Sequence, residues 1–197
     1  PAVVATAQAQ QEVVATAPSE AVQREMQAVQ DLMARAVAEF EGPQQNRSIV
    51  ILDDIAQRLE VLRGQGSLPS RGRDLLVQAY ELRARVYFAS GLTEKASESF
   101  RLLVQLRPDF ALSKEKVSPK VVDLFNSLKK SLVGYLAVSS RPAGAKVTVT
   151  GATGRVEIGV TDFFPVEVLA GEYTVEVEKE GHQTEKRSVS IAPRATE

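Results

Sequence analysis

The sequence contains no cysteine, no tryptophan and a single histidine, His182. Without cysteine there are no disulfides, thiolate metal sites, iron–sulfur clusters or cysteine nucleophiles. One histidine cannot supply the two or three imidazoles that a catalytic zinc site usually needs. Only Glu180 and Glu185 lie at ligand spacing around His182, so we expect it to be a packed or solvated side chain. We therefore expect no enzyme activity, no metal and no cofactor.

An excess of charge of one sign is lacking too. The 197 residues carry 24 Lys and Arg against 25 Asp and Glu, a formal net charge of −1. This balance gives no electrostatic reason to expect nucleic acid as a partner. No apolar run is long enough to cross a bilayer, so we expect no transmembrane segment in this sequence. Other protein subunits remain as the expected partners.

Sequence signatures of catalysis are also missing. There is no G-x-S-x-G motif, no Walker loop and no G-x-G-x-x-G. Asp53 and Asp54 are adjacent, and adjacent helical side chains point about 100° apart, which suits an acid/base pair poorly. Six arginines fall between residues 58 and 85 but are interspersed with acidic residues. We expect them on solvated helix faces, with a basic patch as the alternative.

The first 18 residues carry one charge, at Glu12, and begin with Pro rather than Met. Small residues and low charge are common just after a removed signal peptide, which favours export to the periplasm or the outer face of a membrane. A proteolytic or engineered boundary is the alternative.

Within this segment Val-Val-Ala-Thr-Ala occurs twice, at residues 3–7 and 13–17. It is too short to bury a core alone, so residues 1–18 are either a linker or an extended docking arm. As an arm, they would contact a partner through four valines: Val3, Val4, Val13 and Val14.

From Ser19 to residue 133, apolar residues recur at spacings of three and four, which predicts an all-α domain of five helices. The helices are expected from Ser19 to Gly42, from Ser48 to Arg63, from Ser70 to Ser90, from a Thr93 cap to Pro108, and from Ser118 to Lys130. Gly91 is expected to make the turn between the third helix and the fourth.

Residues 77–110 resemble one tetratricopeptide unit. The pattern is carried by Tyr80, Ala84, Tyr87, Gly91, Ala96, Phe100, Leu103 and Pro108. No second copy aligns, so a single unit flanked by variant helices is expected. The resemblance implies peptide binding on the first helix of the unit, through Gln78, Glu81, Arg85 and Phe88. Alternatively these residues are solvated or packed on the first two helices. The residues of carboxylate-clamping members are not matched, so capture of a C-terminal carboxylate is not expected.

From Gly134 the periodicity changes to two, which predicts a small antiparallel β-sandwich over residues 134–197. Six strands are expected, at residues 135–139, 146–150, 155–160, 164–169, 172–179 and 184–191. The clearest is the fifth, in which Tyr173, Val175 and Val177 alternate with polar residues. The fold class expected is therefore α+β, with two domains.

This second domain resembles the PEGA domain, a small all-β module of surface and exported bacterial proteins. The similarity rests on Ser140-Arg141-Pro142-Ala143-Gly144-Ala145 and the strand after it, Gly151, Gly159-Val160-Thr161, Ala170-Gly171-Glu172-Tyr173 and Glu180-Gly181-His182. Ala143 stands where the family has the Glu of its name. The resemblance implies an exported, non-catalytic module.

Phe163 and Phe164 precede the fourth predicted strand. If the strand begins at residue 164, parity with Val166 and Val168 places Phe164 inside and Phe163 outside. An outward Phe163 would pack on the helical domain or anchor a partner.

Together these features predict a non-catalytic exported accessory or scaffold subunit. It would bind and stabilise a bacterial envelope complex, including an integral-membrane one, through its arm and its helical face. The alternative is a cell-wall or glycan-binding module, for which the β-domain offers Tyr135, Phe163 and Tyr173 as aromatic platforms.

Overall fold

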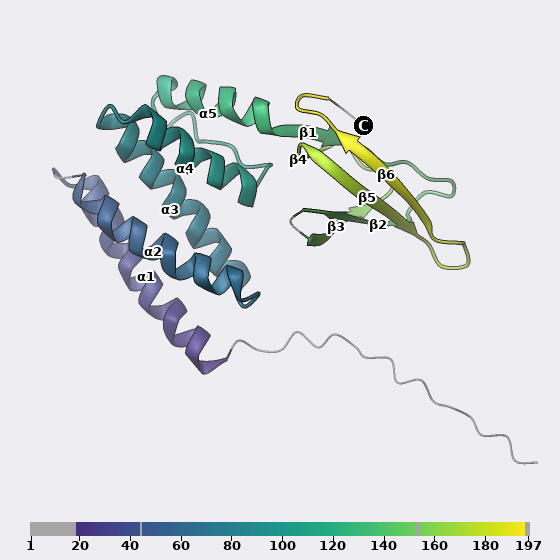
Figure 1. Cartoon of the computed structure of the whole chain (residues 1–197), viewed down its shortest axis with the longest axis horizontal. Helices are drawn as coiled ribbons and strands as arrows, with labels where there is room; N and C mark the ends of the chain where they lie inside the picture. Colours follow the sequence, from purple (N-terminus) through teal and green to yellow (C-terminus); the bar gives the residue numbers. More distant parts are fainter. Residues whose placement is uncertain (1–18, 44, 153, 196–197) are drawn as a thin grey trace, which may run out of the picture.

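The computed structural model describes residues 19–43, 45–152 and 154–195. Five helices form an N-terminal domain, and two small antiparallel sheets follow (Figure 1). The α+β class predicted from periodicity is confirmed. The helices are α1 Glu20–Glu41, α2 Arg47–Gly64, α3 Ser70–Ala89, α4 Thr93–Leu106 and α5 Pro119–Leu132.

The helix ends follow local chemistry. Ser19 caps α1, its hydroxyl accepting the Val22 N–H at 3.3 Å. Thr93 is not the cap of α4 as predicted: it is the first helical residue, and the carbonyl of Leu92 accepts the Ala96 N–H at 3.0 Å. Gly91 makes the α3–α4 turn with φ +77°, a conformation that favours glycine.

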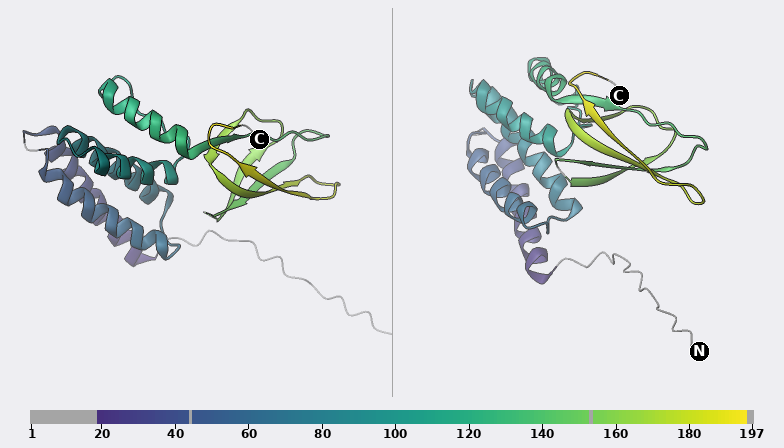
Figure 2. Two further views of the ribbon diagram at one scale, coloured as in Figure 1. Left: turned by 45° about the horizontal axis from the view of Figure 1, so that its top comes forward. Right: turned by 45° about the vertical axis from the view of Figure 1, so that its right-hand side comes forward.

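Successive helices pack on one another, α1 on α2 through to α4 on α5. The α3–α4 pair is the most extensive of these contacts, and the views in Figure 2 show the helices stacked as one array. Ala84 and Ala96 are fully buried between helices, as their small side chains predicted for a close approach. Phe100 and Phe125 are fully buried and meet edge to face, with ring centroids 5.2 Å apart, which ties α4 to α5.

The β-domain contains six strands close to those predicted. They are β1 Val133–Leu136, β2 Lys146–Gly151, β3 Gly154–Val160, β4 Val166–Leu169, β5 Gly171–Glu178 and β6 Glu185–Ile191. β1 pairs with β4, and the second sheet has the order β3-β2-β5-β6. Leu136 and Val168 from the first sheet share a core with Val147, Val149 and Val175 from the second. The first strand is shorter than predicted, because its pairing with β4 ends at Leu136.

The two domains join directly where α5 ends at Leu132 and β1 begins at Val133. The Ala170 N–H donates to the Leu132 carbonyl at 2.7 Å, and Val133 belongs to the helical core. At Gly134 a Cβ would lie 2.5 Å from the Ala192 carbonyl oxygen, so no larger residue fits there without a backbone shift. The joint is a packed region and not a linker. In the described part of the chain, none of the helices has the length and hydropathy of a membrane span.

Candidate protein-interaction surfaces

The helical residues predicted to bind peptide lie along one side of α3. Gln78 is exposed, whereas Glu81, Arg85 and Phe88 are half-buried. Arg85 is held by its own chain: it pairs with Glu81 at 3.3 Å, and its guanidinium lies 4.7 Å from the centre of the Phe40 ring of α1. It also donates to the Lys116 carbonyl at 3.3 Å.

Arg85 and Phe88 border a hollow of about 430 Å³ between α1, α3 and the segment before α5. Phe40 and Val121 contribute to the same lining. The structure therefore brings Glu81, Arg85 and Phe88 together, partly covered by α1, and leaves Gln78 on open surface. Val3, Val4, Val13 and Val14 lie outside the described residues.

The arginines between residues 58 and 85 are mostly committed to ion pairs. Arg83 pairs with Asp53 at 2.8 Å, while Arg58 pairs with Asp54 at 2.9 Å and with Glu25 at 3.0 Å. The hydrogen bonds to Asp54 and Glu25 raise the pKa of Arg58. Asp53 and Asp54 thus serve different arginines, as expected for adjacent helical residues that point apart.

The predicted orientation of the phenylalanine pair is wrong. Phe163 is half-buried against the core of the β-domain, while Phe164 is 92% exposed. The physical reason is that β4 begins only at Val166, so residues 161–165 are a loop in which strand alternation does not apply. Val160 and Pro165 are exposed as well, so three apolar side chains within six residues face solvent.

The aromatic residues considered for glycan binding do not form an exposed platform. Tyr135, Phe163 and Tyr173 are all half-buried. The Tyr173 hydroxyl donates to the Leu169 carbonyl at 2.8 Å, and burial raises the pKa of Tyr173. Its ring packs over Gly151, where a Cβ would lie 2.4 Å from a ring carbon.

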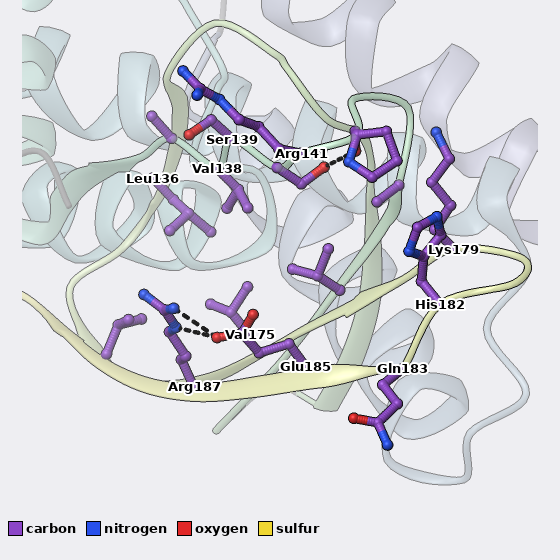
Figure 3. Close-up of a pocket in the computed structure, with 16 residues that line it drawn as sticks. Leu136, Val138, Ser139, Arg141, Val175, Lys179, His182, Gln183, Glu185 and Arg187 are labelled. Carbon is purple, nitrogen blue, oxygen red and sulfur yellow. Dashed lines mark hydrogen bonds and ion pairs between the residues drawn. The ribbon is translucent and has the colours of Figure 1, made fainter.

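The β-domain also contains a groove that the sequence did not reveal. A hollow of about 560 Å³ lies between the connection that follows β1 and the β5–β6 hairpin. Figure 3 shows the side chains that line it. Its apolar lining is formed by Val138, Val175, Val177 and Val189. Its charged and polar border includes Arg141, Lys179, His182, Glu185 and Arg187.

The strand register explains why charged residues reach this groove. Val177 pairs with Glu185 and Val175 with Arg187, so both charged side chains share the inner face of the sheet with the valines. Arg187 and Glu185 form an ion pair at 2.6 Å. In the sequence, Glu185 and Arg187 alternate in step with Val189, which places all three on the same face of the strand. From alternation alone, this pattern indicates only a strand whose first residues are polar.

His182 was expected to be packed or solvated, and it is exposed at the β5–β6 turn. Among the described residues, no group of three or more His, Asp or Glu is placed to hold a metal ion.

The comparison with protein families supports the predicted resemblance of the second domain. The family model of the PEGA domain matches residues 133–196. No tetratricopeptide family model matches the helical region, although the five predicted helices are present. Neither the comparison with curated proteins nor that with solved structures found a match to the chain.

Proposed function

We propose that this chain, in which a PEGA domain follows five helices, is a non-catalytic accessory or scaffold subunit that binds other proteins of a bacterial envelope assembly. Its location would be the periplasm or the outer face of a membrane, in keeping with the exported proteins in which PEGA domains occur. Binding would proceed by surface burial, and an integral-membrane complex fits the role.

The exposed side chain of Phe164 is the observation that carries this proposal. Its neighbour Phe163 packs against the β-domain core, so the chain that presents Phe164 is anchored. Burying a phenylalanine side chain stabilises a contact by roughly 1.5–3 kcal/mol. Large side chains that become fully desolvated are the usual centres of protein interfaces. The Phe164 side chain is 92% exposed, so it contributes little burial free energy to its own fold and would contribute most of it on contact with a partner.

The joint between the domains supports a scaffold role. Lys129 of α5 pairs with Glu167 of β4 at 2.7 Å and donates to the Phe110 carbonyl at 2.8 Å. Because these bonds hold the helical domain against the first sheet, a partner on Phe164 and another on α3 would be kept at a defined separation. Residues 1–18 would add a third contact, through the valines of the repeated pentapeptide.

Site-specific photo-crosslinking in the native host tests this function. A photoreactive phenylalanine analogue at position 164 is compared with the same analogue at Val50, an apolar residue of α2 that is 75% exposed. We expect a discrete protein adduct from position 164 in the envelope fraction and none from position 50. Equal adducts at both positions, or no adduct at position 164, would contradict the proposal.

A further inference from the structure

We infer that the groove of the β-domain binds an extended acidic peptide segment of another protein, which adds as a strand along the open side of the sandwich. The inference rests on the proposed protein-binding function and specifies a second surface and the chemistry of its partner. It involves none of the residues of the Phe164 loop.

The groove exists because the two sheets are unequal. β1 and β4 form a pair, whereas the facing sheet has four strands. Among the strands that the structure describes, β6 pairs only with β5, and β1 stops at Leu136. The inner face of the β5–β6 hairpin beyond this point is therefore left uncovered, with Val177 and Val189 only partly buried.

Unpaired backbone runs along one border of the groove. The chain continues from β1 through Ala137, Val138 and Ser139, and within the described residues no hydrogen bond involves the backbone of these three. The outer edge of β6 is likewise free of a partner strand in the described part of the chain. Free N–H and C=O groups beside an apolar groove are what an added strand uses for affinity.

The charge around the groove selects an acidic segment. Arg141, Lys179 and Arg187 lie at its border (Figure 3). Arg187 is already paired with Glu185 at 2.6 Å, so Arg141 and Lys179 carry the positive charge that a peptide would meet. Lys179 donates to the Ala143 carbonyl, which leaves its charge uncompensated. Arg141 has no ion pair within the described residues. Its planar guanidinium is suited to bind a carboxylate through two hydrogen bonds.

The outer face of the same sheet shows the contrast. There the charges are already paired: Lys146 with Glu157 at 2.7 Å, and Glu176 with both Arg155 and Lys186 at 3.3 Å. An acidic peptide would have to displace existing carboxylates on that face. A peptide strand of alternating apolar and acidic residues fits the groove instead. Its apolar side chains would pack on the valines of the groove, and its carboxylates would reach the cations at the border.

The test is a titration of the purified full chain with three fluorescent synthetic peptides. Two have about eight residues, the length of a strand: one alternates Val and Glu, and the other alternates Val and Gln. The third has the 15 residues of positions 3–17 of this chain. We expect the Val/Glu peptide to bind about tenfold or more tightly than the Val/Gln peptide, with an affinity that falls as salt rises. Equal binding of the first two peptides, or tighter binding of the third, would overturn the inference.

Two variants locate the site. Arg141→Gln should lower the affinity for the Val/Glu peptide by about tenfold and leave the affinity for the Val/Gln peptide unchanged. The matched control is Lys146→Gln, which removes a cation from the outer face of the same sheet and should change neither affinity. If both variants lower the affinity for the Val/Glu peptide equally, the effect is due to net charge, and the inference that the peptide binds in the groove is wrong. If the peptides fail to bind while position 164 still forms its adduct, the groove inference is wrong and the proposed function stands.

Discussion

Replacing Lys129 with Met removes the ammonium that joins the two domains while keeping most of the side chain's length. The Lys129 Nζ lies 2.7 Å from the Glu167 carboxylate and 2.8 Å from the Phe110 carbonyl. The side chains of Lys129 and Glu167 are 13% and 26% exposed, so water replaces the lost donor only in part.

The expected loss of stability follows from this burial. Exposed ion pairs contribute about 0–1 kcal/mol, whereas removing one partner of a buried pair costs about 3–5 kcal/mol. With most of both groups covered, and two acceptors left without a donor, we expect Lys129→Met to lower the free energy of unfolding by about 2 kcal/mol. Glu167→Gln retains an acceptor for Lys129, so it should cost less.

The matched control is Lys146→Met. The Lys146–Glu157 pair has the same 2.7 Å distance, but its side chains are 51% and 57% exposed. We expect a much smaller loss there than for Lys129→Met, because solvent screens an exposed ion pair. The assay is urea unfolding of the full chain, followed by circular dichroism, with the free energy taken from the midpoint and the slope. Equal losses in the two variants would refute the argument that burial, and not distance, determines the contribution.

Two further outcomes follow from the helical core. Phe125→Ala should destabilise the chain by about 3–5 kcal/mol in the same urea assay, because the fully buried ring packs edge to face on Phe100; a loss similar to that of Phe164→Ala, which removes a solvated ring, would contradict this packing. Tyr80→Phe should cost about 1 kcal/mol at neutral pH, because it removes the 2.8 Å bond from the Tyr80 hydroxyl to Glu60. Burial and then this bond raise the pKa of Tyr80 above its usual 10.0, so the wild type loses stability as the pH rises past 10, where the unfolded chain ionises first. The difference between wild type and Tyr80→Phe should therefore narrow at high pH, and a constant difference in pH-dependent unfolding would show that Tyr80 titrates normally.

The local sequence pattern was sufficient to predict those features that depend on residues close together in the chain. The spacing of apolar residues predicted five helices and six strands close to their observed bounds, and the quoted residues around Arg141 and Gly171 identified the PEGA domain. The small size of Ala84 and Ala96 predicted the close helix pair. These features depend on period, cap and turn chemistry, which are local.

Tertiary structure decided the features that depend on where an element stops and what lies across from it. Parity placed Phe164 inside because the strand was expected to start there, but pairing with β1 begins only at Val166. For Arg85 the sequence left a binding face and packing on the first two helices open, and the structure places its guanidinium 4.7 Å from the centre of the Phe40 ring of α1.

The helix and strand pattern, the all-β character of the second domain and the lack of thiol and clustered imidazole chemistry follow from the amino-acid sequence. The exposure of Phe164 and the apolar groove bordered by Arg141, Lys179 and Arg187 follow only from the folded arrangement. Periodicity reports which face of an element is buried, whereas a groove depends on the unequal width of two sheets and on the register that brings distant residues to the same edge.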